Sequence, residues 1–337
     1  MRKLSVLSAV ALFGLLLPAP GGARDINWEG VDSNSVVLFY PGVASWEFLT
    51  SDDHRLGGRD IKMTRKDCRH CHLSKEGDLD LKADDIAAGS IKMKMSHSAF
   101  EPDPIPGKPG SMLAEVKAAY DSDFLYIRVE WAAKGAGWRQ VKGTGAVPDR
   151  VSMQLGATDA HFRKYGCFIT CHNDLNTMPG SPAKKDVEGN PYYGRLGRDD
   201  VRLYAFYAKS SWEESKGPKE LDAALKKHGR IDLRSMEFAG GKAEPFDGWI
   251  FDDRRWEEKK GLDDTGAWAN GKYSSVFNIR LNSANPFDVK ASEGEAVSAG
   301  FAIHEDGAKK RKHYVSFPYT IGLGASGADI EAVKLSD

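Results

Sequence analysis

Two short motifs use all four cysteines of the chain, and each motif ends in a histidine. The first consists of Cys68, Cys71 and His72, and the second of Cys167, Cys171 and His172. Two thiols at such a spacing can add to the vinyl groups of one haem, which places the adjoining imidazole under the iron as its proximal ligand. The chain is therefore predicted to carry two covalently attached haem c groups.

Other uses of paired cysteines stay open from the sequence. Exported proteins favour oxidised cysteines, which would allow a disulfide, and two cysteines with nearby histidines can satisfy a tetrahedral zinc ion. A dithiol oxidoreductase would need a thioredoxin-like βαβ context, which the sequence does not suggest. The second motif has three residues between its cysteines, so haem attachment there requires the intervening turn to bulge.

The other histidines are candidates for the second axial position of each haem. For the first haem we predict His54, which precedes the motif across a turn at Gly57 and Gly58 and can fold back over the other haem face. His97, which lies close to Met95, is the alternative.

For the second haem we predict His313. It alternates with Val315 and Phe317, so one strand face would set an imidazole in an apolar wall. His304 ends the preceding strand, near the tip of a predicted hairpin, and is the alternative. We expect its side chain to be solvated.

Residues 1–23 have the features of a secretory signal peptide. Arg2 and Lys3 form the positive region, Leu4 to Leu17 the apolar region, and Gly21 to Ala23 a small-residue cleavage site. No other stretch approaches the roughly 18 apolar residues of a transmembrane helix. We therefore predict an exported, soluble periplasmic protein, which agrees with the compartment in which c-type haems are attached. The formal net charge of −1 argues against nucleic acid as a partner.

The chain after the signal is predicted to be mainly β, as a β-sandwich haem-binding domain preceded by a loop-rich segment with the first haem. We place the N-terminal haem segment at 24–110 and the sandwich with the second haem at 111–337, because the proline-rich stretch 101–110 suits a linker. Only Pro218 to His228 is predicted to be helical. The predicted strands are 125–131, 151–155, 201–208, 273–281, 297–304 and 313–321.

Several stretches resemble the ethylbenzene-dehydrogenase-related dihaem cytochromes, with their haem-binding domain like that of cytochrome c-552 and dimethylsulfoxide reductase. The resemblance extends over nearly all of the chain after the signal. It is carried by Ser45 to His54, Cys68 to His72, Pro104 to Lys108, Leu125 to Trp131, Gly166 to Asp174 and His313 to Ser316.

The resemblance implies a β-sandwich like that of the haem-binding gamma subunits of ethylbenzene and dimethylsulfide dehydrogenases, which hold one haem b between a methionine and a lysine. In the alignment His172 falls near the methionine and His313 at the lysine. The chain thus departs from those subunits, because its sandwich haem would be covalent and held by two histidines, and a second haem precedes it.

Together these features predict a periplasmic dihaem cytochrome that passes single electrons between a quinol-linked membrane cytochrome and a periplasmic reductase or dehydrogenase. If both irons have two histidine ligands, no position is open for a substrate. Two alternatives stay open: a haem reductase or peroxidase with one open iron, and a haem subunit of a molybdenum dehydrogenase or reductase complex.

Overall fold

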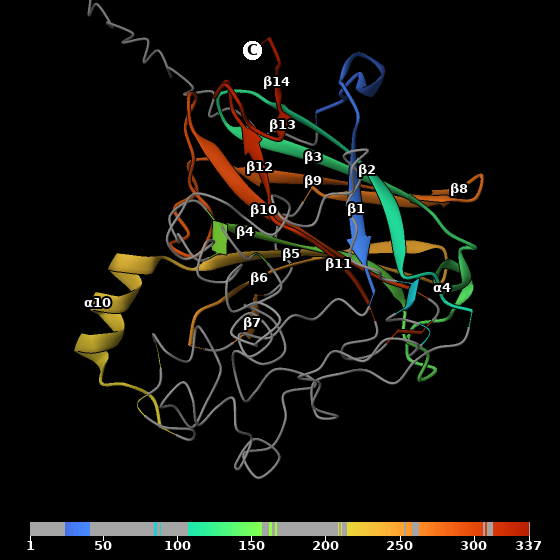
Figure 1. Cartoon of the computed structure of the whole chain (residues 1–337), viewed down its shortest axis with the longest axis horizontal. Coiled ribbons are helices and arrows are strands. Elements are labelled where there is room, and N and C mark those ends of the chain that lie inside the picture. The colour runs from blue at the N-terminus through green and yellow to red at the C-terminus, as the bar shows by residue number, and fades with distance from the viewer. Residues whose placement is uncertain are drawn as a thin grey trace, which may run out of the picture.

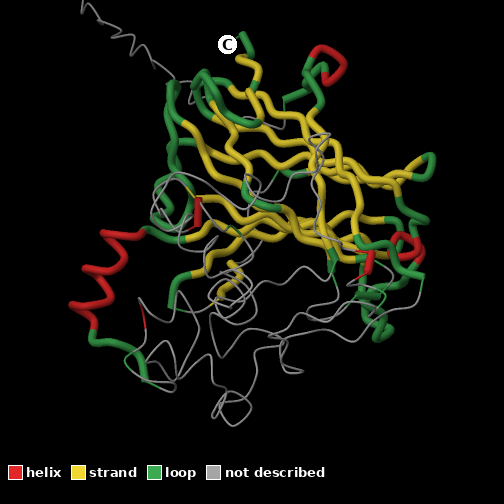
Figure 2. The backbone as a smooth tube through the Cα atoms, viewed as in Figure 1, coloured by secondary structure: helices red, strands yellow, loops and turns green. Residues whose placement is uncertain are grey.

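The structure is a computed structural model, and it describes residues 24–40, 84–85, 88, 107–156, 162–163, 166, 208, 210, 214–252, 254–257, 263–305, 307–308 and 313–336. Strands make up about half of this described backbone, and helices only a small part of it (Figure 2). The prediction of a mainly β fold is confirmed. None of the described helices is long and apolar enough to cross a membrane.

In the described part of the chain, the strands form one curled and mostly antiparallel sheet (Figure 1). They are β1 (Asn34–Phe39), β2 (Ser111–Tyr120), β3 (Phe124–Ala132), β4 (Asp149–Gly156), β5 (Ile231–Ala239), β6 (Lys242–Ile250), β7 (Arg254–Glu257), β8 (Thr265–Ala269), β9 (Lys272–Arg280), β10 (Ala296–His304), β11 (Tyr314–Ser316), β12 (Tyr319–Gly322), β13 (Ile330–Glu331) and β14 (Val333–Lys334). Three helical elements accompany them: η1 (Trp28–Gly30), α4 (Ala136–Arg139) and α10 (Pro218–His228).

The order of strands across the sheet is β7-β6-β5-β4-β10-β11-β1-β2-β3-β9-β8. β12 adds to β10, β13 pairs in parallel with β12, and β14 pairs in parallel with β2. β10 therefore has β4 on one side and β11 on the other, in the middle of the sheet. The segment before residue 111 contributes β1, and the predicted domain division at residue 110 stays a prediction.

The sheet curls so that its two ends face each other, and this gives the sandwich its two layers. β8 lies against β6, since a methyl group at Gly266 would come within 2.9 Å of the Cβ of Ala243. Between the layers, the ring of Phe238 from β5 lies 5.8 Å from Trp131 of β3 and 4.3 Å from Tyr273 of β9, measured between centroids. Burial of such apolar side chains is the main force that holds the layers together.

Tight turns fix the register of the hairpins. Asn270 and Gly271 both have positive φ (52° and 80°), as a type I′ turn between β8 and β9 requires. Between β2 and β3, the Oδ1 of Asp121 accepts hydrogen bonds from the backbone N–H groups of Asp123 (2.9 Å) and Phe124 (2.8 Å). These local interactions set which side chains point into the core.

Most of the predicted elements that fall on described residues are confirmed, namely the strands at 125–131, 151–155, 273–281 and 297–304 and the helix Pro218 to His228. The single strand predicted over 313–321 is wrong, because the chain forms β11 and β12 with a break at Phe317 and Pro318. Proline has no N–H to give to the ladder, which accounts for the break. The strand predicted at 201–208 lies outside the described residues, apart from Ala208.

Candidate functional site

Most of the predicted haem residues lie outside the described part of the chain. These are both cysteine motifs with their proximal histidines, and the predicted axial ligands of the first haem: Cys68, Cys71, His72, Cys167, Cys171, His172, His54 and His97. The two axial candidates for the second haem, His304 and His313, are described. They lie side by side.

His304 is the last residue of β10 and His313 immediately precedes β11. The antiparallel register pairs Ile303 with Tyr314, so the next pair outward is His304 with His313. Their imidazole rings stack, with centroids 4.2 Å apart and an angle of 12° between the ring planes. The predicted hairpin therefore brings two imidazoles into face-to-face contact.

The expectation that His304 is solvated is wrong, because its side chain is only 7% exposed. The reason is that β10 is a central strand, and His304 is paired on its other side with Arg150 of β4. His313 is buried as well, at 3% exposure, as expected for an imidazole in an apolar wall. The sequence pattern missed the burial of His304 because it does not show that β4 flanks β10.

Both histidines lie on the outer face of the sheet. The residues of β10 that pack into the core between the layers alternate with His304, and they are Val297, Ala299, Phe301 and Ile303. This outer face is nonetheless withdrawn from solvent, since Val315 is 1% and Phe317 3% exposed. The ring of Phe317 lies 5.5 Å from that of Phe39, centroid to centroid. The result is a buried apolar patch that includes two imidazoles.

The chain just before the second cysteine motif also packs on this outer face. Phe162 is fully buried against Gly156, at the end of β4. The N–H of Gly166 donates to the carbonyl of Phe162 (2.7 Å), which closes one helical turn. A methyl group at Gly166 would lie 3.1 Å from Pro318, and Gly166 has a φ of +54°. The residue before Cys167 is thus held against the segment that carries His313.

Ser316 stabilises the break between β11 and β12. Its Oγ accepts a hydrogen bond from the backbone N–H of Phe301 (2.9 Å) and donates one to the carbonyl of Phe317 (2.7 Å). Because Ser316 is completely buried, these bonds are sheltered from water. They fix the path of the chain between His313 and Pro318.

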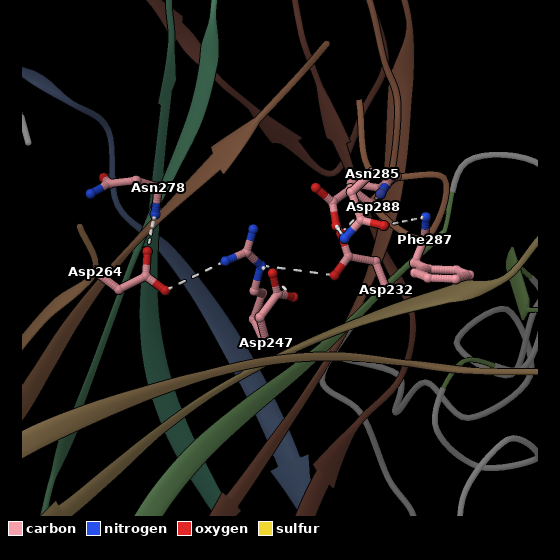
Figure 3. Close-up of polar contacts among 9 residues, drawn as sticks. Asp232, Asp247, Asp264, Asn278, Asn285, Phe287 and Asp288 are labelled. Carbon is pink, nitrogen blue, oxygen red and sulfur yellow. Dashed lines mark hydrogen bonds and ion pairs between the residues drawn. The ribbon is translucent and has the colours of Figure 1, made fainter. Parts of the chain in front are cut away.

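A second group of buried polar residues was not predicted from the sequence: Arg234 with three aspartates (Figure 3). The Nε of Arg234 lies 3.5 Å from Asp247 and 3.8 Å from Asp232, and its Nη1 lies 3.8 Å from Asp264. One cation thus faces three carboxyl groups inside the protein. Asp232 and Arg234 alternate along β5 as an exposed charged pair would, so the sequence alone gave no signal of their burial.

This charged cluster connects strands of both layers. Asp232 accepts a hydrogen bond from the N–H of Val289 (2.9 Å), and Asp264 accepts one from the N–H of Asn278 on β9 (2.7 Å). Burial raises the pKa of Asp232 from 3.8 to about 7, although the positive charge of Arg234 opposes the shift. Burial also raises the pKa of Asp264. The cluster can therefore hold a proton near neutral pH, and it lies on other strands than the two histidines.

Comparisons with known proteins agree with the resemblance found in the sequence. Cytochrome c-552 of Stutzerimonas stutzeri is 29% identical over 338 residues, which cover 99% of this chain and 100% of that protein. Cytochrome c-551 of Rhodocyclus tenuis is 24% identical over 314 residues, which cover 91% and 99%. Among solved structures, the chain is similar to a family 9 carbohydrate-binding module from Caldicellulosiruptor kristjanssonii in complex with cellotriose, over 66% of this chain and 76% of that one. The identity is 10%, and the TM-score of 0.24 is too low to indicate a shared fold.

A family model described as ethylbenzene dehydrogenase matches residues 92–316. This match includes the second cysteine motif, His304 and His313, and it extends over more than half of the chain. The chain belongs to the ethylbenzene dehydrogenase family.

Proposed function

We propose that this protein is a periplasmic dihaem c-type cytochrome that transfers single electrons between redox partners. Its relatives over nearly the full length are named cytochromes c, which supports covalently bound haem and a role in electron transfer. The number of haems is inferred from the two cysteine motifs. The location is inferred from the signal peptide at 1–23 and from the site of c-type haem attachment.

In this proposal each haem has two histidine ligands. The first haem is bound by Cys68, Cys71 and His72, with His54 as its second axial ligand. The second is bound by Cys167, Cys171 and His172, with His313 as its second axial ligand. When bound, each haem supplies an iron that changes by one electron, and the chain sets its ligands and surroundings.

The observation that carries the proposal is the buried imidazole of His313 close to the segment that leads into the second motif. His313 and Pro318 are five positions apart in the sequence, a span of at most about 18 Å. His172 follows Gly166, which packs on Pro318, by six positions, or at most about 22 Å. The chain can therefore bring His172 and His313 to the two faces of one haem.

We further infer that the second haem lies on the outer face of β10 and β11, outside the apolar core of the sandwich. His304 and His313 both point away from the core, whose inner face is lined mainly by apolar side chains. The outer face offers buried Val315 and Phe317 beside the imidazole. Apolar side chains around a haem exclude water and influence its reduction potential.

Two histidine ligands per iron favour electron transfer over catalysis, because neither iron then has a position open to a substrate. The proposed partners are redox proteins: a quinol-linked membrane cytochrome on one side and a periplasmic reductase or dehydrogenase on the other. The protein would accept one electron at a time and pass it on, with no bond made or broken in a substrate.

The test is low-temperature electron paramagnetic resonance of the oxidised protein, matured in a periplasm, with and without cyanide. We expect two low-spin haems that change little on brief exposure to cyanide. Mass spectrometry of the same sample should show two covalently added haems. A high-spin haem that binds cyanide at once would instead indicate an enzyme with an open iron, and a single added haem would remove the second motif from the proposal.

The ligand assignments are tested in the same samples by substitution. His313→Ala should convert the second haem to high spin while leaving it attached, and His54→Ala should do the same to the first haem. His97→Ala is the matched control for His54 and should leave both haems low spin. A low-spin spectrum retained in His54→Ala but lost in His97→Ala would reverse that assignment.

A further inference from the structure

We propose that His304 is a positioning residue of the second haem site, whose ring stacks on His313 and fixes the rotation of that ligand ring. The inference rests on the proposed function, since it takes His313 as the residue that binds iron. It adds a role for a histidine that no haem motif includes.

The two rings meet because of their register. Residues directly opposite each other in an antiparallel pair have Cβ atoms about 4.5–5.5 Å apart, close enough for their side chains to touch. His304 and His313 occupy such opposite positions at the open end of the β10 and β11 pair. With ring planes 12° from parallel and centroids 4.2 Å apart, one imidazole covers the face of the other.

This contact excludes the simplest alternative, in which both histidines bind one iron from opposite sides. A haem held in that way lies between its two axial ligands. Rings whose faces are already in contact at 4.2 Å leave no room for a macrocycle between them. In this arrangement at most one imidazole of the pair can be an axial ligand of that iron, and the other is left to support it.

The support is rigid because the two rings are anchored from different sides. His304 is held by the pairing of β10 with β4, where Arg150 lies opposite it. His313 is followed by Tyr314, whose hydroxyl donates to the carbonyl of Pro109 (2.8 Å) and whose ring lies 5.6 Å from that of Tyr40. The backbone that carries each ring is thus fixed by a separate set of contacts.

Fixing the plane of an axial histidine has consequences for the metal. Metal-binding histidines are usually oriented by a partner outside the coordination sphere, most often through the second ring nitrogen. The flat ring of His304 against the face of the His313 imidazole likewise restricts the rotation of that imidazole. Ring pairs of this kind contribute about 0.5–1.5 kcal/mol beyond simple burial, so loss of the stack should make the ligand roughly 2- to 10-fold easier to displace.

The experiment compares His304→Phe, which keeps a flat ring, with His304→Leu, which does not. Both are made in the full chain matured with its haems, and haem content is checked by mass. The readouts are the low-spin resonance of the second haem and the equilibrium constant for its slow displacement by cyanide. We expect His304→Phe to match the unchanged protein. His304→Leu should broaden the low-spin resonance and bind cyanide roughly 2- to 10-fold more tightly.

Three results would overturn the proposal. If His304→Leu leaves both readouts unchanged, the stack does not position the ligand. If His304→Phe and His304→Leu broaden the resonance and strengthen cyanide binding equally, a ring nitrogen of His304 positions the ligand, and its flat face does not. If His304→Phe turns the second haem high spin, His304 is itself the iron ligand.

His313→Ala, measured alongside, separates this proposal from the proposed function. A second haem that stays low spin in that variant rejects His313 as the ligand, and with it the role of His304, while two attached haems would still support the cytochrome. Where His304→Leu does not accumulate, His304→Gln is the variant without a ring, and the same outcomes apply.

Discussion

At the scale of single residues, Gly166 links the described fold to the second cysteine motif. Its left-handed backbone, with φ at +54°, and its close approach to Pro318 both require a residue without a side chain. The cysteine that follows it is the first attachment point of the proposed second haem. Gly166 thus holds the last described residue before that motif against Pro318.

We predict that Gly166→Ala lowers the free energy of unfolding by about 1–2 kcal/mol through backbone strain, with an added cost from contact with Pro318. Urea denaturation of the haem-loaded protein measures the loss. Gly143→Ala is the control, because Gly143 also has positive φ, +89°, but no neighbouring atom within 4 Å of an added methyl group. Equal losses in the two variants would show that the contact with Pro318 has no energetic weight.

At the scale of elements, the break between β11 and β12 decides how His313 and Pro318 are placed relative to each other. Ser316 fills the break with two buried hydrogen bonds and so replaces regular strand pairing over a short stretch. β10 receives β4, β11 and β12 along its length. Both faces of β10 are buried from Val297 to His304, including the face with His304.

We predict that Ser316→Ala destabilises the protein by about 1–3 kcal/mol, because the buried N–H of Phe301 loses its acceptor. The free energy of unfolding is measured by urea denaturation, and the low-spin resonance of the second haem should broaden at the same time. Ser35→Ala on β1 is the control, since Ser35 is exposed and its hydroxyl donates to Glu115 at the surface. A loss in Ser35→Ala as large as in Ser316→Ala would contradict the explanation.

At the scale of the whole molecule, the curled sheet separates two environments. An apolar core lies between its layers and ends in the cluster of Arg234 and three aspartates (Figure 3). The histidine pair lies on the outer face of its central strands. Its ion pairs and hydrogen bonds connect β5 and β6 with β9, with the segment before β8 and with the segment before β10. The charge state of that cluster therefore affects how firmly the layers hold together.

We predict that the contribution of Asp232 to the free energy of unfolding falls as the pH rises from about 4 to about 7. The carboxyl group of Asp232 titrates at 3.8 in its ordinary state and at about 7 in the fold, so the folded protein binds the extra proton in this range. Asp232→Asn should flatten this dependence and make the protein more stable than the original at pH 8, by at least about 1 kcal/mol.

The measurement is the urea midpoint as a function of pH, on protein with both haems. The amide can still accept the hydrogen bond from Val289, so the comparison isolates the charge of Asp232. Asp222→Asn is the control, because Asp222 is exposed on α10 and pairs with Lys226 at the surface. If Asp232→Asn and Asp222→Asn have the same pH profile, the cluster does not hold the proton.

The sequence determined the class of fold and predicted the covalent chemistry. The spacing of Cys68 and Cys71 from a histidine is a local property of the chain. The alternation of apolar side chains along 125–131 or 297–304 indicates strands, because successive side chains of a strand point to opposite faces. Both kinds of signal need only neighbouring residues. The strand β5 was missed because Asp232 and Arg234 stand on its buried face, and β2 because its inward positions include Ala114 and Ala118, which are poor strand formers.

Only the tertiary structure decided which residues meet. The stacking of His304 on His313, their position on the outer face, the packing of Gly166 on Pro318, and the charged cluster all depend on strands that are distant in sequence. Alternation along one strand shows that its two faces differ, but not which of them is covered or by what. That depends on how the sheet curls and which strand lies on each side of β10, and both follow from packing of the whole chain.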